Sequence, residues 1–380
     1  MGSILGVTEA DQRRDRTSVK WRLWGPEVLP LWVAEMDAQP CPAVVEAVTA
    51  AVARGDTGYP MGGPYAVSLA RFADRWWGWE VDPAATAGCA DVMIGIEAVL
   101  RAVTDPEGAV VLSPPVYDSF FGFVATTGRR RIDAPLTEGG RLDAVALETA
   151  FREAVAGGHR SAYLLCNPQN PTGTVHTREE LTMLAGLADE FGITVVADEI
   201  HAPLVYAVST PFTPWLTVSD RGFSVWSASK SWNLAGFKAA LTIAGPASRA
   251  DLARVHEVHT HGVGHIGAIA HMAAFDHGRG WLEQVVEELD SNRHRLAELV
   301  ATRLGGVRMH VPEATYLAWL DFRDVGLGDD PATELRARAG VGLSSGPNYG
   351  AEAGRGFARL NFATSPEILI EAVDRIAAAL

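Results

Sequence analysis

Lys230 is the residue whose sequence surroundings point most directly to chemistry. It lies in residues 223–238, F-S-V-W-S-A-S-K-S-W-N-L-A-G-F-K, where serines flank the lysine and apolar residues flank the serines. Burial disfavours the charged form of a lysine and lowers its pKa. The amine then becomes a nucleophile that can form a Schiff base. Taken alone, the segment fits a surface lysine after a strand equally well.

Two upstream segments favour the buried lysine. Residues 164–173 (L-L-C-N-P-Q-N-P-T-G) and 193–201 (I-T-V-V-A-D-E-I-H) are apolar runs that end in polar residues. This pattern is typical of buried parallel strands, and ligands bind at the carboxyl ends of such strands. A Schiff-base lysine with an acid facing a pyridinium nitrogen is what pyridoxal 5′-phosphate (PLP) requires. Three strand ends offer candidates for this chemistry: Asn170, Asp198 with His201, and Lys230.

The order and spacing of these motifs identify a family. N-P-Q-N-P-T-G, D-E-I-H and S-A-S-K-S-W-N-L-A-G together resemble the fold-type I PLP-dependent enzymes, the aspartate aminotransferase superfamily. The last two runs resemble most its MalY/PatB-type cystathionine β-lyase branch, a group of C–S lyases. The resemblance extends from Leu29–Asp37 to Ala358–Pro366. It implies an α/β fold, with a mostly parallel sheet sandwiched by helices in a large domain and a smaller α+β domain.

The resemblance also implies a division of the chain. Residues 1–40 would form an N-terminal arm and part of the small domain, and the arm itself is expected over 1–28. Residues 41–280 would form the large PLP-binding domain, and 281–380 the small C-terminal domain. The resemblance also implies that the apolar run over 29–34 leads into the active site on the substrate side; a strand followed by a turn is its alternative. We further expect a strand before Arg359. The pattern predicts helices over Pro42–Arg54, Thr177–Phe191, Ser248–His256, Ile266–Phe275 and Trp281–Leu304. The resemblance implies that the last of these links the domains.

Five residues receive cofactor roles from the resemblance. Lys230 would hold PLP and then act as the base that removes the substrate's α-proton. Asp198 would keep the ring nitrogen protonated by its opposite charge, and Asn170 would donate to the phenolic oxygen of the ring. His201 would orient Asp198 or that oxygen. Tyr117, in P-P-V-Y-D-S-F-F, would stack on the ring; a core position is its alternative.

The phosphate is expected at a helix start, because free N–H groups and the positive end of the helix dipole bind anions. In residues 91–103 we place this start at the glycine, so that the backbone donors are Gly95, Ile96 and Glu97. The resemblance adds three ligands: Ser227, Lys238 and, from a neighbouring subunit, Tyr59. Many relatives carry arginine where Lys238 lies, so the contact would be a point charge. Plain packing is the alternative for Tyr59.

Arg359 is the candidate for substrate binding. It lies in A-R-L-N-F-A-T-S-P and matches the family arginine that binds the substrate α-carboxylate as a bidentate pair. An arginine between Phe357 and Leu360 is better explained by a buried anion than by a surface position. Arg355 is the nearest alternative, and its glycine-rich surroundings indicate a loop.

Composition excludes several classes of partner. The 380-residue chain has a formal net charge of −14, which argues against nucleic acid or an anionic membrane surface. No apolar run reaches the ~18–20 residues that a membrane helix needs, and no secretory signal is visible. Three distant cysteines fit a reducing compartment, so we expect a cytoplasmic protein. The histidines between 256 and 271 lack acids or cysteines at ligand spacing, so no metal is expected.

The resemblance of D-E-I-H and S-K-S-W-N-L-A-G to the lyase branch implies β-elimination from an S-substituted cysteine such as cystathionine, with release of a thiol, pyruvate and ammonia. An aminotransferase is the closest alternative, because both reactions share every step up to loss of the α-proton. A regulatory protein that binds PLP and acts through a protein partner is the second. Tyr59 further implies a homodimer with shared active sites.

Overall fold

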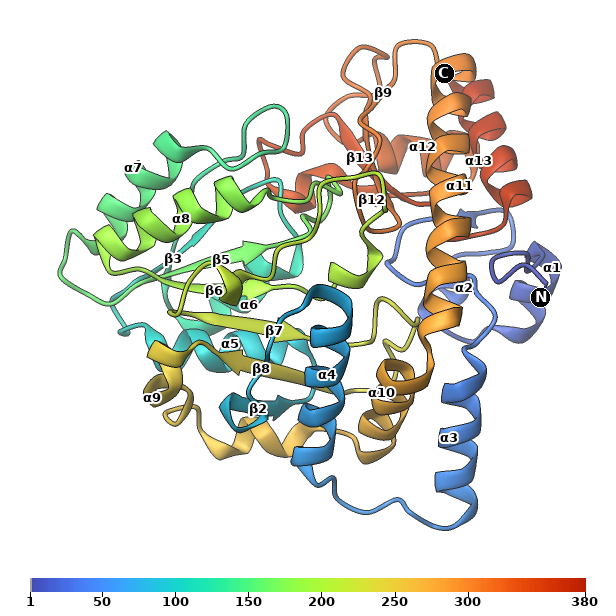
Figure 1. Ribbon diagram of the computed structural model, residues 1–380. Helices are drawn as coiled ribbons and strands as arrows, with labels where there is room; N and C mark the ends of the chain where they lie inside the picture. Colours follow the sequence, from blue (N-terminus) through green and yellow to red (C-terminus); the bar gives the residue numbers. More distant parts are fainter. Residues whose placement is uncertain (1) are drawn as a thin grey trace.

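A seven-stranded sheet forms the centre of the fold (Figure 1). The structure, a computed structural model, describes residues 2–380. The strand order is β2–β8–β7–β6–β5–β3–β4; β8 is antiparallel to both neighbours and the other pairs are parallel. The mostly parallel sheet confirms the predicted fold class. The strands are β2 (Thr86–Cys89), β3 (Ala109–Leu112), β4 (Arg130–Asp133), β5 (Ala162–Cys166), β6 (Thr194–Asp198), β7 (Phe223–Trp226) and β8 (Ala240–Ala244).

Helices cover both faces of this sheet, because side chains of a strand alternate between its faces. In β5, Leu164 and Cys166 join the core beneath α5 and α6, whereas Tyr163 and Leu165 join the core beneath α7 and α8. The sequence of such a strand is therefore apolar throughout. The four helices are α5 (Val92–Val103), α6 (Ser119–Thr127), α7 (Ala144–Val155) and α8 (Arg178–Phe191). The predicted cap of α8 is confirmed, since Thr177 and Glu180 form a capping box.

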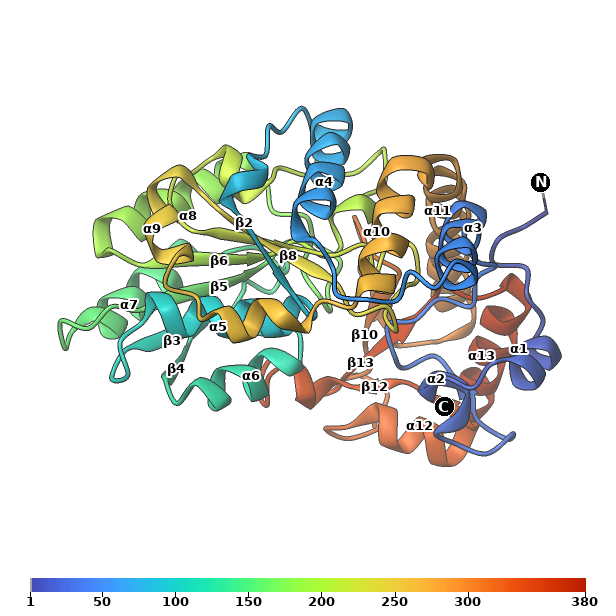
Figure 2. The ribbon, with the colours of Figure 1, turned by 90° about the horizontal axis from the view of Figure 1, so that it is seen from below.

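A smaller β-rich region lies beside the central sheet (Figure 2). Its four-stranded antiparallel sheet has the order β12–β13–β10–β9, and a two-stranded parallel sheet joins β1 to β11. The helix predicted over 281–304 is confirmed as α11, which leads into this region; its role as a link between domains stays a prediction. The strands are β1 (Leu29–Pro30), β9 (Arg308–Met309), β10 (Leu317–Asp321), β11 (Val341–Gly342), β12 (Ser344–Ser345) and β13 (Phe357–Asn361), and the helices are α11 (Arg279–Arg303), α12 (Pro331–Ala339) and α13 (Pro366–Ala379).

The remaining helices complete the packing between the two regions. α10 (His265–His277) packs against both α3 (Pro42–Ala53) and α4 (Gly62–Trp77). The predicted helix over 248–256 is wrong: α9 (Arg249–Leu252) is a single turn. The His256 side chain accepts the Val258 backbone N–H at 3.2 Å, a local bond that competes with helix continuation. Short 3-10 helices span Pro83–Ala85, Ala202–Leu204, Trp215–Thr217, Pro246–Ser248, Glu257–Gly262 and Gly346–Tyr349.

Part of the predicted N-terminal arm is buried, so the expectation of an arm outside the core is wrong at Ile4, Leu5, Gln12, Lys20, Trp21 and Val28. Residue 1 lies outside the described residues. The segment contains α1 (Glu9–Asp15) and α2 (Val19–Arg22). The Lys20 ammonium lies 2.9 Å from Asp37 Oδ2, and both side chains are almost fully buried. Trp21 Nε1 donates to Asp37 Oδ1 at 2.7 Å. Because Asp37 neutralises the charge of Lys20, this part of the charged N-terminal segment can pack in the core.

The predicted strand over 29–34 is shorter than expected. Only Leu29–Pro30 pairs with a neighbouring strand. Beyond it, the Leu31 carbonyl still accepts the backbone N–H of Asn361 in β13 at 2.9 Å. The carbonyls of residues 32–35 instead accept bonds from side chains, as described below. No helix within residues 2–380 has the length and apolar character needed to cross a membrane. The division at residues 40 and 280 stays a prediction.

Replacing Lys20 by methionine should lower the free energy of unfolding by about 3–5 kcal/mol, because the Asp37 carboxylate would stay buried without its cation. Urea unfolding of the purified protein measures this change. Arg14→Met is the matched control, since Arg14 pairs with Asp11 and Asp15 while exposed. The control should stay within about 0.5 kcal/mol of the parent. Equal effects of the two substitutions would contradict a buried ion pair.

Candidate active site

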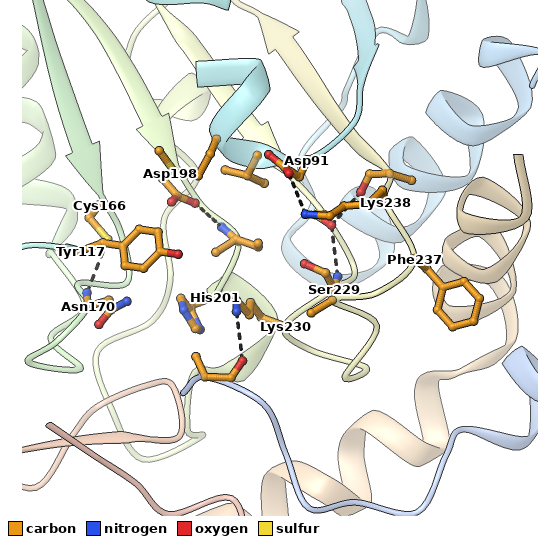
Figure 3. A pocket seen from close by; sticks show the side chains of 17 residues that line it. Asp91, Tyr117, Cys166, Asn170, Asp198, His201, Ser229, Lys230, Phe237 and Lys238 are labelled. Atoms are coloured by element: carbon orange, nitrogen blue, oxygen red, sulfur yellow. Dashed lines mark hydrogen bonds and ion pairs between the residues drawn. The ribbon is translucent and has the colours of Figure 1, made fainter. Parts of the chain in front are cut away.

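Two adjoining cavities lie where β5, β6 and β7 end. The aspartate cavity, about 150 Å³, contains seven of the predicted residues (Figure 3): Tyr117, Asn170, Asp198, His201, Ser227, Lys230 and Lys238. The tryptophan cavity, about 390 Å³, is lined by Trp24, Trp32 and Arg359 among others. Ala34, Tyr117 and Lys230 line both cavities. Lys230 therefore borders two cavities, one lined by Asp198 and the other by Trp24 and Trp32.

Lys230 differs from the other lysines in its partners. The chain contains only Lys20, Lys230 and Lys238. Lys20 pairs with Asp37, and Lys238 pairs with Asp91 at 2.9 Å. Lys230 instead donates to the Ala34 carbonyl at 3.0 Å, and within residues 2–380 no carboxylate lies within 4.0 Å of its amine.

Burial is the main cause that lowers the pKa of Lys230, to about 8, and the positive charge of Arg359 lowers it further. A substantial fraction of the amine is then neutral near pH 8. Of the three lysines, Lys230 is therefore the one whose nitrogen is prepared to act as a nucleophile or base.

Asp198 ends β6 and points into the aspartate cavity (Figure 3). Its carboxylate accepts the Ile200 N–H at 3.1 Å. Burial raises the pKa of Asp198 to about 7. A cation placed beside it would stabilise its charged form and lower this pKa, so the residue is suited to a positively charged ring nitrogen.

Glu199 follows Asp198 but points elsewhere, because neighbouring side chains at the end of a strand alternate in direction. Its two oxygens accept the Trp215 backbone N–H at 2.6 Å and Trp226 Nε1 at 2.8 Å. Of the two acids in D-E-I-H, one therefore faces the cavity and the other anchors buried tryptophans. The sequence analysis assigned no role to Glu199. The alternation of side chains along β6 could have shown that Glu199 points away from Asp198.

His201 and Tyr316 complete the wall near the amine. His201 is buried, and burial holds its pKa well below the ordinary value, so the ring is neutral. Within residues 2–380 its Nδ1 has no hydrogen-bond partner. Tyr316 packs edge-on against His201 and donates to the Ala34 carbonyl at 3.1 Å. Sequence reasoning missed Tyr316, which carries no motif and precedes a strand of the smaller sheet.

Arg359 lies in the middle of β13, so the expected strand contains this residue rather than preceding it. Its guanidinium donates to Asn170 Oδ1 at 3.0 Å and to the Trp32 carbonyl at 2.8 Å. It lies over the Tyr349 ring, 5.0 Å from the centroid. Nε has no partner within residues 2–380, and no carboxylate there lies within 4.0 Å of the group. A buried guanidinium without a carboxylate is suited to an incoming anion.

The predicted helix start at Gly95 is wrong. Helix α5 begins at Val92, and Asp91 caps it by accepting the Ile94 N–H at 2.9 Å. Gly95 N–H already donates to the Asp91 carbonyl at 3.0 Å. Ile96 belongs to the core, and Glu97 pairs with Arg101. The three predicted donors therefore lie inside the helix and outside the cavity, whereas Val92 and Met93 line it.

The two other phosphate candidates on this chain lie near that helix start. Lys238 is exposed and pairs with Asp91, the capping residue. The Ser227 hydroxyl donates to the Ala239 carbonyl at 2.9 Å, and its oxygen accepts the Ser229 N–H. The first N–H groups of a helix lack intrahelical partners. Lys238, Ser227 and the first N–H groups of α5 together form a polar and positive end of the aspartate cavity.

Gly95 serves close packing instead. A Cβ at this position would lie 2.7 Å from Cys89 Sγ and 2.9 Å from Thr242 Oγ1. The absence of a side chain lets α5 approach the sheet.

Gly95→Ala should therefore lower the free energy of unfolding by about 1–3 kcal/mol, the usual cost of overpacking. Gly186→Ala is the control within α8, where an added Cβ meets nothing within 4 Å. It should raise stability by about 0.5–1 kcal/mol through helix propensity. Chemical denaturation of both variants measures the two changes in the free energy of unfolding, which should have opposite signs. A neutral or stabilising Gly95→Ala would contradict the close-packing role.

Tyr59 lies outside both cavities. Its side chain is 99% exposed, and nearby Met61 is 81% exposed, in the loop between α3 and α4. Its role across a subunit interface stays a prediction. Within residues 2–380, no three side chains of His, Cys, Asp or Glu are arranged to hold a metal ion.

The fold and these residues define a family. The model of the aminotransferase class I and II family matches residues 26–376, and the chain belongs to this family, with the fold-type I architecture of PLP-dependent enzymes. A Mycobacterium leprae protein provisionally named cystathionine β-lyase is 46% identical over 97% of this chain and 96% of its own length. The cystathionine β-lyase PatB of Bacillus subtilis is 33% identical over 99% of this chain and its whole length.

A solved structure agrees with this relationship. A Corynebacterium diphtheriae protein, provisionally described as a PLP-dependent β-cystathionase, superposes with a TM-score of 0.92 at 35% identity. The superposition covers 99% of both chains. The likeness thus includes both β-regions and the segments that contribute the two cavities.

Proposed function

We propose that this protein is a PLP-dependent C–S β-lyase acting on S-substituted cysteines. The reaction R–S–CH₂–CH(NH₃⁺)–COO⁻ + H₂O gives R–SH, pyruvate and NH₄⁺. One observation supports it most: the only lysine amine without a carboxylate partner within residues 2–380 shares one cavity with buried Asp198 and the adjoining cavity with buried Arg359. The relatives named cystathionine β-lyase support this reaction over others of the family.

The residues present fit PLP. Its phosphate would meet Lys238, Ser227 and the first N–H groups of α5, and its ring nitrogen would face Asp198. Its phenolic oxygen would accept from Asn170 and lie near His201, whose Nδ1 lacks a partner within residues 2–380. Tyr117 would cover the ring. When bound, PLP supplies an electron sink for the charge left by loss of the substrate's α-proton.

Side chains of the protein would bind the substrate carboxylate and accept the α-proton. Arg359 would bind the substrate α-carboxylate with the guanidinium that now donates to Asn170 and Trp32. Lys230 Nζ would receive the α-proton, a transfer eased by its lowered pKa. Departure of a thiolate from the β-carbon would then complete the elimination, because sulfur is a better leaving group than carbon or nitrogen.

The working protein would be a cytoplasmic homodimer with shared sites. Tyr59 and Met61 are exposed between α3 and α4, and Val45 and Val52 are exposed on α3. Such an apolar surface would be covered by a second copy, which would bring Tyr59 toward the partner's phosphate. Three free cysteines fit a reducing compartment. We keep the division into residues 1–40, 41–280 and 281–380 as part of this proposal.

Incubation of the PLP-loaded protein with L-cystathionine should release pyruvate and a free thiol in equal amounts without an added keto acid. Lactate dehydrogenase coupling measures pyruvate, and a thiol reagent measures homocysteine. Lys230→Ala should lose at least about 10³-fold in rate, because the base would be missing.

A requirement for a keto-acid acceptor, with formation of a new amino acid, would contradict the lyase proposal and favour an aminotransferase. Arg355→Ala is a matched control for Arg359→Ala, since Arg355 is exposed and pairs with Glu352. Arg355→Ala should keep full activity, whereas Arg359→Ala should raise KM steeply.

A further inference from the structure

The end of the aspartate cavity that would bind the phosphate already carries a negative side chain. Asp91 lines this end together with Val92, Met93 and Lys238. Figure 3 shows Asp91 and Lys238 facing each other, and Asp91 Oδ2 lies 2.9 Å from Lys238 Nζ. Its other oxygen, Oδ1, accepts the Ile94 N–H at 2.9 Å as the cap of α5. One carboxylate therefore contacts both the cation and the helix start to which a phosphate would bind.

The cavity has no spare cation for a phosphate. Its acidic and basic side chains are two aspartates and two lysines, Asp91, Asp198, Lys230 and Lys238, and no arginine within residues 2–380 lines it. Lys230 would react with the aldehyde of PLP, which leaves Lys238 as the lining cation for a phosphate. A phosphate monoester carries a charge of about −1.5 to −2 at pH 7. It would therefore compete with Asp91 for a single ammonium.

Capping the helix does not require a charge at Asp91. Asparagine caps helices about as well as aspartate, because either side-chain oxygen can accept the backbone N–H. Asp143 caps α7 in the same way, accepting the Val145 and Ala146 N–H groups at 2.9 and 3.1 Å. It lies outside the lining of the aspartate cavity. The two caps can thus be compared, one beside the cavity and one away from it.

We propose that Asp91 limits the affinity of this protein for PLP, because its carboxylate neutralises Lys238 and repels the phosphate. The inference rests on the placement of the phosphate in the proposed function, and it concerns retention of the cofactor rather than the reaction that follows. Like charges at a partly exposed site still repel each other after screening by water and salt. The Lys238 side chain is 60% exposed, so its ammonium has room to turn from Asp91 to a phosphate.

Asp91→Asn should lower the dissociation constant of PLP about 10-fold, because the cap is kept and the negative charge is lost. Equilibrium dialysis of the full-length protein across a series of PLP concentrations measures this constant. Pyridoxal, which lacks the phosphate, is the matched ligand, and its dissociation constant should change less than about 2-fold. Asp143→Asn is the matched control variant and should change neither constant.

A second variant separates repulsion of the phosphate from orientation of Lys238. In Lys238→Gln the Asp91 carboxylate loses its cation, so adding Asp91→Asn should tighten PLP binding by more than about 10-fold. If Asp91 served to orient Lys238, Asp91→Asn would weaken PLP binding, and adding it to Lys238→Gln would have no effect.

Weaker or unchanged PLP binding by Asp91→Asn would overturn the proposal, as would equal tightening of PLP and pyridoxal. The reaction is tested separately, by pyruvate release from L-cystathionine. Tighter PLP binding by Asp91→Asn in a protein that releases no pyruvate would remove the lyase function and leave this inference standing.

Discussion

The site depends on a half-buried Lys230 amine that has no carboxylate within 4.0 Å among residues 2–380. Partial desolvation then favours the neutral amine, while the amine donates a hydrogen bond to the Ala34 carbonyl at 3.0 Å. Residues 32–35 supply such carbonyls instead of extending β1: Trp32 accepts from Arg359, and Val33 and Glu35 accept from Asn361. The loop is thereby held by the groups that also line the site, and the buried pair of Lys20 and Asp37 secures the segment beside it.

Two sheets must meet for this arrangement to form. The central sheet places Asp198 and Lys230 at the ends of neighbouring parallel strands, while β13 of the smaller sheet brings Arg359 to Asn170. The guanidinium also lowers the pKa of Lys230 through its charge. One residue of the smaller sheet thus positions an anion site and helps to prepare an amine on the central sheet.

The sequence predicted what local patterns encode. Apolar strands precede the polar residues Asn170, Asp198 and Lys230. The spacing of Thr177 and Glu180 predicts the start of α8. The start of α5 was misplaced because Asp91 caps it while Gly95 serves packing. The burial of Lys20 depends on Asp37, 17 positions away along the chain, and no local period signals such a pair. The tryptophan cavity is assembled from segments around residues 24, 118, 336 and 359, so only the fold reveals that they share one cavity.

The central claim is that Lys230, alone among the lysines, carries the cofactor. Incubation with PLP, reduction with borohydride and peptide mass spectrometry test it directly, because the chain has only three lysines. The account predicts one phosphopyridoxyl group per chain, on the peptide containing Lys230, and no such group on a Lys230→Ala variant that retains its fold. Stoichiometric labelling of Lys20 or Lys238, or full labelling of Lys230→Ala, would contradict it.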